Sequence, residues 1–500
     1  MLVGRGPVGG VSVLELRTLQ ERLLTVVVRR VVLVVVLGLG LLMFGCAPES
    51  DPPTSSTVPT ASASTTLPAP STTSTSRLAK PGRVGLYRAD PGTLEPVRAS
   101  QPLTTGDSMW GSSSPNGEWL VLNVWYAGIP ETDILRVINV QSGAVVTEAE
   151  VGAPQWGIDI ADDGTVYRLA GNMSFRVEVL TPGAEAFDDL LSLPQRFSPW
   201  SSTEILSDHR LGWIGSVVST DGLLVAAVGI ADVASGDFDL YELPGVALEG
   251  TDQFDVGDWA VGEFYQPGVV WSPDDSKVYV VHADEPVVTA IDLTAGTVVE
   301  HDWEAPTAWL DRLAAFWNPV AVAKGPTAGA IASAAQSPDG KTLYVSSEVG
   351  EFVRWNELEW HVEWKPQGIQ AIDLATWEVV DTWDLPTAQV ALTPDGASLI
   401  GWGVTRKDTV ETTIYTGHPV VVIDTETRNV VGEVDLPYDD LRLVSFSPDG
   451  SYVYFTQWDE TFLSLDLSTN ALVGTYKMAG AMGGVFGESG LVAAPIQAGS

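Results

Sequence analysis

The sequence predicts an all-β fold, and two turns that recur along the chain carry this prediction. The first is a Pro-Asp-Gly corner such as Ser337-Pro338-Asp339-Gly340, and its seven copies are separated by steps of 47, 58, 53, 65, 56 and 54 residues. The second is typified by Ile372-Asp373-Leu374-Ala375-Thr376 and recurs after most of the corners. A fixed unit at this period indicates repetition of one small supersecondary element.

Each part of the repeated unit has a local physical reason. In the corner, Pro presets φ, Asp can bond its own backbone, and Gly adopts positive φ without a Cβ clash. Apolar runs such as Leu343-Tyr344-Val345 follow the corners and are typical of strands. With the second turn and the Val-rich run after it, one unit forms four antiparallel strands, which is one blade of a β-propeller.

Seven units are complete, and two half-units lie at the ends of the repeat region. Residues 84–93 match only the second half of a unit, and residues 485–494 match only the first half. Pairing these halves would close the ring and leave no sheet edge open. The sequence therefore predicts a single propeller of seven or eight four-stranded blades, closed by N- and C-terminal strands. Both numbers stay open because residues 161–193 match the unit poorly.

The corner, the Tyr-Val strand after it and the Ile-Asp-x-x-Thr turn resemble the YVTN-type β-propeller repeat, one of the WD40-like and quinoprotein-like propellers. The resemblance covers roughly residues 83–497, and it lacks the regular Trp-Asp pair of true WD40 repeats. Because the matching residues are turn and core residues, the resemblance implies a fold more than an activity. Lactonases and amine dehydrogenase large subunits are similar propellers, so it also implies an enzyme as the alternative function.

The N-terminal region has the pattern of an export signal. An apolar run over residues 31–45 follows Arg29-Arg30 and is shorter than the about 20 residues that span a bilayer comfortably. Cys46 is the single cysteine of the chain, and Met43-Phe44-Gly45-Cys46 resembles the lipobox of bacterial lipoproteins, with Met where Leu is usual. The resemblance implies a signal peptide over residues 1–45, lipidation of Cys46 and an extracytoplasmic, membrane-anchored protein. A plain cleaved signal is the alternative.

The next segment is predicted to be a tether. Residues 49–76 contain 21 Ser, Thr or Pro among 28 positions. A segment of this composition has too few apolar side chains to bury a core and fold. We therefore expect a lipidated Cys and tether over residues 46–76, and the propeller over residues 77–500. The longest repeat interval predicts an insertion in the propeller around residues 305–367.

The charge balance excludes one class of partner. The formal net charge is −38, and removing residues 1–45, which hold five Arg and two Glu, makes it −41. Nucleic-acid binding needs Lys and Arg to neutralise phosphates, so we expect no nucleic-acid partner. Solubility is the simplest reason for this charge, and attraction of cations or basic partners is the other.

One segment of the expected insertion has the pattern of a cation site. Strand alternation places Glu357, Glu359, His361 and Glu363 on one face of residues 357–364. Three carboxylates and an imidazole could hold Ca²⁺ or another divalent cation. The alternative is the solvated outer face of a hairpin, and no cofactor is predicted.

Tryptophans give a second candidate site. Trp110, Trp156 and Trp213 each lie a few residues before a corner, which predicts positions on innermost strands of successive blades. A ring of indoles at the channel mouth could stack on a sugar or another flat ligand. Packing between blades is the alternative, and Trp271 lies in a different register.

The function that fits these features is a cell-envelope lipoprotein whose propeller is a non-catalytic binding or scaffold module. Its partner would be an envelope protein or a glycan, and its membrane contact would be the lipid on Cys46. No catalytic residue is assigned, because no nucleophile elbow, HExxH, CxxC or Walker pattern supports one. The alternatives are a lactonase-like enzyme with a metal or carboxylates at the channel mouth, and a mainly structural envelope protein.

Overall fold

The structure is a computed structural model, and its description covers most of residues 84–495. The described residues are 84–96, 103, 105–106, 108–125, 132–152, 155–171, 174–201, 203–206, 210–218, 224–256, 259–303, 327–354, 360–408, 413–436, 441–447, 449–457, 461–477, 485–486 and 491–495. They lie in one compact unit, residues 76–500. Cys46, the signal peptide and the tether lie outside the described residues.

The described strands form eight sheets, which we number in the order of the chain. Sheet 1 contains β3 (Ser108–Ser113), β4 (Trp119–Trp125), β5 (Thr132–Asn139) and β6 (Ala144–Gly152). Sheet 2 contains β7 (Gln155–Ile160), β8 (Val166–Ala170), β9 (Arg176–Leu180) and β10 (Asp188–Ser192). Sheet 3 contains β11 (Ser198–Pro199), β12 (Glu204–Ile205), β13 (Arg210–Val218), β14 (Leu224–Asp232) and β15 (Phe238–Ala247). Sheet 4 contains β18 (Gly268–Trp271), β19 (Lys277–Val281), β20 (Val287–Asp292) and β21 (Thr297–Asp302).

The other four sheets complete the set. Sheet 5 is built on β22 (Thr327–Gln336), β23 (Thr342–Arg354), β24 (Trp360–Asp373) and β25 (Val379–Trp383). Sheet 6 contains β26 (Gln389–Leu392), β27 (Ser398–Trp402), β30 (Val420–Asp424) and β31 (Val430–Val434). Sheet 7 contains β32 (Arg442–Phe446), β33 (Tyr452–Thr456), β34 (Thr461–Asp466) and β35 (Ala471–Lys477). Sheet 8 joins β36 (Val485–Phe486) and β37 (Leu491–Pro495) to β1 (Val84–Arg88) and β2 (Thr105–Gly106).

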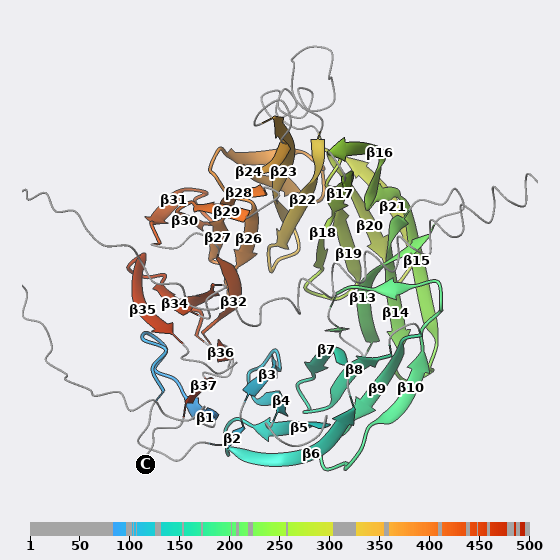
Figure 1. The fold of residues 1–500 in the computed structure, drawn as a ribbon, viewed down its shortest axis with the longest axis vertical. Coiled ribbons are helices and arrows are strands. Elements are labelled where there is room, and N and C mark those ends of the chain that lie inside the picture. The colour runs from blue at the N-terminus through green and yellow to red at the C-terminus, as the bar shows by residue number, and fades with distance from the viewer. Residues whose placement is uncertain are drawn as a thin grey trace, which may run out of the picture. The chain divides into compact units, whose positions relative to one another are not determined.

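The sheets follow one another around a ring, with the first strand of each sheet toward the ring axis (Figure 1). Each sheet buries apolar side chains against both neighbours, because a sheet flanked on two faces has no face left for solvent. The clusters that join successive sheets include Val121 with Ile158, Leu169 with Trp213, Val228 with Val280, Val281 with Val345, Tyr344 with Leu399, Val422 with Val453, Tyr454 with Leu94, and Leu86 with Leu120. This arrangement confirms the predicted all-β propeller.

Closure by the two chain ends is confirmed as well. β1 pairs antiparallel with β37 from Val84 opposite Pro495 to Arg88 opposite Leu491. The predicted regularity is met only in part: six sheets have four strands, sheet 3 has a fifth short strand, and sheet 5 has eight strands. The described residues thus form six regular four-stranded blades, whereas the sequence predicts seven or eight. The prediction differs because local repeat patterns do not show where added strands pair.

The Pro-Asp-Gly corners have the predicted geometry where they are described. In the corner of sheet 5, the Ser337 hydroxyl donates to Asp339 Oδ1 at 2.7 Å, and Gly340 has a φ of 71°. Bonds from Lys341, Ser337 and the Lys341 backbone lower the pKa of Asp339 to about 2. Bonds from Ser272 and Ser276 do the same for Asp274. Carboxylates such as these stabilise the turns through their hydrogen bonds. The predicted corner at residues 219–222 lies outside the described residues.

Candidate functional site

The most distinctive surface is made by strands that depart from the repeat. The hairpins of β16 (Glu249–Val256) with β17 (Trp259–Gln266), and of β28 (Val404–Asp408) with β29 (Thr413–Gly417), add to sheet 5. They give a continuous strand order β16-β17-β22-β23-β24-β28-β29, which we call the composite sheet. Parallel pairing of β17 with β22 joins one hairpin, and antiparallel pairing of β24 with β28 joins the other.

The outer halves of β23 and β24 carry the composite sheet beyond the regular blade. A register shift between Ser346 and Glu348 marks where the blade part ends. Such an irregularity bends and twists a strand, so it can re-aim the extension. In Figure 1, β23 and β24 extend past the ring at the top of the view. The sequence predicted an insertion around residues 305–367, and residues 305–326 and 355–359 of it lie outside the described residues.

A row of side chains crosses four strands of the composite sheet. Cross-strand pairing sets Glu351 opposite Glu363, Glu363 opposite Lys407, and Lys407 opposite Ile414, so these four residues share one face. Lys365 Nζ lies 3.1 Å from a Glu351 oxygen and 3.2 Å from a Glu363 oxygen. Burial opposes the charge of Lys365, but the bonds from the two carboxylates outweigh it and raise the lysine pKa.

The opposite face of the same strands packs around Trp364. Its ring packs with Ala328 and Phe352 in a small buried cluster. Its indole Nε1 donates to Asp408 Oδ2 at 3.1 Å, and the Arg406 guanidinium lies 4.7 Å from the ring centroid. The two faces of the extension therefore differ as strand alternation predicts, with one face polar and the other packed.

The predicted cation site is described only in part. Glu357 and Glu359 lie outside the described residues, whereas His361 and Glu363 share one face of β24. His361 is buried, and both burial and Lys407 lower its pKa against the opposing effect of Glu363. Glu363 bonds Lys365, which competes with any cation there. Within the described residues, no three His, Cys, Asp or Glu side chains form a group that could hold a metal ion.

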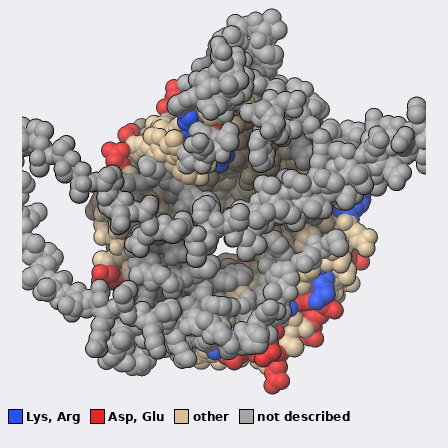
Figure 2. All heavy atoms as spheres, viewed as in Figure 1, with Lys and Arg blue, Asp and Glu red and all other residues tan. Residues whose placement is uncertain are grey.

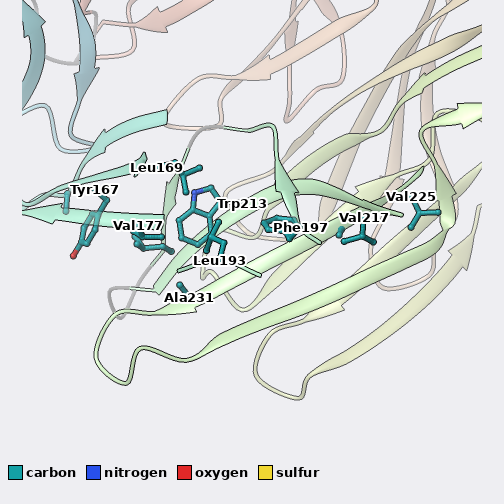
Figure 3. Packing of buried hydrophobic residues seen from close by; sticks show 12 residues of the cluster. Tyr167, Leu169, Val177, Leu193, Phe197, Trp213, Val217, Val225 and Ala231 are labelled. Carbon is teal, nitrogen blue, oxygen red and sulfur yellow. The ribbon is translucent and has the colours of Figure 1, made fainter. Parts of the chain in front are cut away.

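The predicted indole site is also described only in part. Trp110 lies on β3 and Trp156 on β7, both innermost strands, but their side chains lie outside the described residues. Trp213 lies on β13, the second strand of its sheet, and it has no exposed surface. Figure 3 shows its ring among Leu169, Val177 and Leu193, where it packs between sheets 2 and 3.

The indole nitrogen of Trp213 is also occupied. Its Nε1 donates to Thr203 Oγ1 at 3.1 Å, and the ring stacks on Phe238 with centroids 6.3 Å apart. A buried and hydrogen-bonded indole has no free face for a ligand. In the structure, Trp213 therefore serves the packing between sheets, and stacking on a ligand stays a prediction for Trp110 and Trp156.

Two carboxyl groups on the neighbouring sheets 2 and 3 form a second candidate site that sequence reasoning missed. Asp159 lies on β7 and accepts a 2.9 Å hydrogen bond from the Ser112 hydroxyl on β3. Glu204 lies on β12 and, although exposed to solvent, is crowded by protein. Burial raises the pKa of Asp159 to about 6. Burial, Asp159 and Asp275 raise the pKa of Glu204 to about 7.

The chemistry available to this pair follows from their shifted pKa values. Carboxyls that titrate near neutrality can donate or accept protons, and such groups are enriched at functional sites. The signal in the sequence was a charged residue between Ile158 and Ile160 in an innermost strand. The approach of Glu204 to Asp159 could not be read from the sequence, because it depends on how sheets 2 and 3 are placed.

Raised carboxyl pKa values predict a measurable pH effect. A carboxyl with a raised folded-state pKa binds protons more tightly when folded, so its ionisation destabilises the fold as pH rises from about 4.5 through about 7. We expect Glu204→Gln to leave stability unchanged at pH 4 and to raise it by about 1 kcal/mol at pH 8, because solvent screens the effect. Urea denaturation at both pH values measures this difference, and Glu148→Gln on an exposed strand is the control. Equal stability of Glu204→Gln and the native chain at both pH values would show that the pKa of Glu204 is not raised by its surroundings.

Figure 2 shows acidic and basic side chains interspersed on the described part of this face, with the most extended acidic group at the bottom of the view. The described residues include no helix long and apolar enough to cross a membrane.

Comparisons with known proteins add little beyond these observations. No protein-family model matches the chain, and no curated protein matches it. Among solved structures, dihydro-heme d1 dehydrogenase NirN in complex with DHE is 14% identical, with a TM-score of 0.42, over 82% of this chain and 76% of that chain. The C-terminal WD40 domain of Sif2 is 12% identical, with a TM-score of 0.42, over 78% of this chain and 93% of that chain. At this level of similarity, neither carries an argument about the function of this chain.

Proposed function

We propose that this chain is a cell-envelope lipoprotein of the YVTN type whose propeller is a non-catalytic binding module for a protein or a glycan. The composite sheet carries the proposal, because strands from three separate segments depart from the repeat and pair with one another there. Additions to a regular scaffold are where specific contacts are usually placed. The composite sheet is therefore the proposed binding surface.

Binding through the composite sheet can be tested with one exposed residue and a matched control. Ile414 on β29 is 50% exposed, and Val299 on β21, outside the composite sheet, is 48% exposed. The native chain, immobilised, is expected to retain a protein from envelope extract or a glycan from an array. Ile414→Glu should weaken this binding at least tenfold, whereas Val299→Glu should leave it within twofold. Equal binding by both variants would place the partner elsewhere, and no retained partner would count against a binding module.

Membrane attachment is tested separately at Cys46. Thioether lipidation of this cysteine would hold the chain in the membrane fraction, because acyl chains partition into the bilayer. We expect Cys46→Ser to move the exported protein to the soluble fraction and to abolish incorporation of labelled fatty acid. Membrane retention of Cys46→Ser without label would contradict the lipoprotein proposal, and it would leave the binding proposal standing.

The pair of Asp159 and Glu204 favours a second candidate function, a propeller enzyme that uses these two carboxylates. General acid-base catalysis needs groups whose pKa values lie near the working pH, and both carboxyls meet this requirement. Turnover of a lactone by the native chain, lost in both Asp159→Asn and Glu204→Gln, would support this candidate. Turnover that survives both substitutions would remove these residues from consideration.

A further inference from the structure

The second recurring turn ends at a position with a left-handed backbone. Four residues after its Asp or Asn, φ is positive in seven sheets, at Leu94, Gly143, Gly236, Gly296, Trp377, Arg428 and Asn470. The four residues that are not glycine have φ between 50° and 62° at this position. The turn therefore accepts a side chain there, despite the general cost of this conformation for residues with a Cβ.

Where this position carries a side chain, that side chain contacts the preceding sheet. The Trp377 ring of sheet 5 stacks on His301 of β21, with centroids 3.8 Å apart and planes 8° apart. Arg428 Nη1 of sheet 6 donates to the Val380 carbonyl of β25 at 3.2 Å. Asn470 Nδ2 of sheet 7 donates to the Val431 carbonyl of β31 at 3.0 Å. Each contact falls on the outermost strand of the neighbouring sheet.

In sheet 4 this position is Gly296, and the corresponding space is open. A Cβ at Gly296 would meet no atom within 4 Å. The turn from Leu293 to Gly296 forms one side of a solvent-filled groove, and Asp239, Leu240 and Tyr241 of β15 form the other side. By contrast, the Leu103 side chain comes within 2.7 Å of the place where a Gly143 Cβ would lie.

The groove keeps an aromatic partner that the missing side chain would use, and it offers a carboxylate beside it. Val380 and Val431 are the residues that a register shift leaves unpaired in their sheets, whereas Asp239 pairs with Ile230 without a shift. The carbonyl of Asp239 therefore belongs to the ladder, and its carboxylate is the acceptor left for the groove. Tyr241 takes the place of His301, because each pairs with the residue four positions before its turn Asp, Val228 before Asp232 and Val288 before Asp292. An aromatic platform and a carboxylate acceptor are therefore both present, while the group that would occupy them is absent from the chain.

We propose that the groove between β15 and the turn from Leu293 to Gly296 binds an arginine side chain of a partner protein. A guanidinium can stack on the Tyr241 ring and donate to the Asp239 carboxylate at the same time. Trp377 makes the stacking contact in the equivalent place of sheet 5. The exposed Asp239 carboxylate and the net charge of −38 favour a cationic occupant.

The acidic side chains around Tyr241 favour a cation in the groove. Burial raises the pKa of Tyr241, and Asp239 and Asp292 raise it further against the opposing effect of Arg210. The Asp292 carboxylate accepts from the Thr294 and Ala295 backbone amides, so it builds the turn, whereas Asp239 remains for a ligand. This site lies away from the composite sheet, and it does not depend on the function proposed above.

Titration of the full chain with two short peptides tests the proposal. The peptides are acetyl-Gly-Arg-Gly-amide and acetyl-Gly-Lys-Gly-amide, and NMR or calorimetry measures their affinities. We expect the arginine peptide to bind at least fivefold more tightly than the lysine peptide, and Asp239→Asn to weaken it at least fivefold. Gly296→Arg fills the groove from within the chain, so it should weaken the peptide at least tenfold. Gly236→Arg, at the same turn position of sheet 3, should leave affinity within twofold.

A second readout protects this test from a folding artefact. Gly296→Arg should melt at a higher temperature than Gly296→Ala, because only the arginine can make the contacts with Asp239 and Tyr241. Absence of arginine binding, equal affinity for the lysine peptide, or full affinity in Gly296→Arg would overturn the proposal. Tighter binding of a matching tryptophan peptide would overturn the assignment to a guanidinium.

Discussion

Deletion of residues 485–500 is expected to abolish cooperative unfolding of the propeller. The deletion removes β36 and β37, so β1 loses its strand partner from Val84 to Arg88. It also opens the clusters that hold Leu86 against Leu120 and Leu94 against Tyr454. The loss should reach about 5 kcal/mol or more, which is comparable to the whole stability of a domain.

Differential scanning calorimetry of residues 77–500 and its truncated form measures this effect. Deletion of residues 496–500 is the matched control, because it leaves every β37 pairing in place. We expect the control to melt like the native domain and the longer deletion to give no sharp transition. A deletion variant that melts as late as the native domain would show that sheets 1 to 7 are stable without closure.

Replacement of Glu178 with Gln is expected to destabilise the fold by about 3 kcal/mol, because it leaves the buried cation of Arg168 without its counter-charge. Arg168 Nε donates to Glu178 Oε2 at 2.6 Å, and the two side chains are 10% and 5% exposed. Arg176 Nε donates to the other carboxylate oxygen at 2.6 Å. The Arg168 guanidinium also lies over the Phe187 ring, 3.8 Å from its centroid.

Glu148→Gln is the matched control, since Glu148 pairs with Arg136 at 2.8 Å but is 53% exposed. Surface pairs contribute little, so this variant should change stability by about 0.5 kcal/mol or less. Urea unfolding at pH 7 compares the two variants. Equal effects of both substitutions would show that the Glu178 pair is not buried in solution.

The same ion pair makes the stability of the fold decrease as pH falls. Burial of Glu178 opposes its charge, but bonds from Arg176 and Arg168 outweigh burial and lower its pKa below 4.5. The folded chain thus holds this proton less tightly than the unfolded chain, and its contribution is present above about pH 4.5 and is lost as pH falls. The difference in stability between the native chain and Glu178→Gln should therefore shrink toward pH 3.

The repeated unit was predictable because its determinants are local. The pattern from Ser337 to Gly340 specifies its own hydrogen bonds, and the turn beginning at Asp373 does the same through the Ala375 and Thr376 amides. Ring closure was predictable too, because the half-units at the two ends complement each other. The fold thus follows from short-range chemistry repeated many times.

The candidate sites were not predictable in the same way. The composite sheet joins β17 to β22 and β24 to β28, and no local pattern shows which strand edges meet. Glu204 and Asp159 come together only because sheets 2 and 3 are neighbours in the ring. The groove at Gly296 was visible only by comparison with Trp377, whose stacking on His301 shows the kind of contact that Gly296 lacks.

An engineered disulfide between β1 and β37 tests the closed ring most directly. Residues 77–500 contain no cysteine, so Gly85→Cys with Ala494→Cys introduces a single pair at directly opposed positions. The closed ring predicts that this pair oxidises within the monomer, and that Gly85→Cys with Val473→Cys on another sheet does not. Free thiols in the first pair after oxidation, or bonds formed only between molecules, would contradict it.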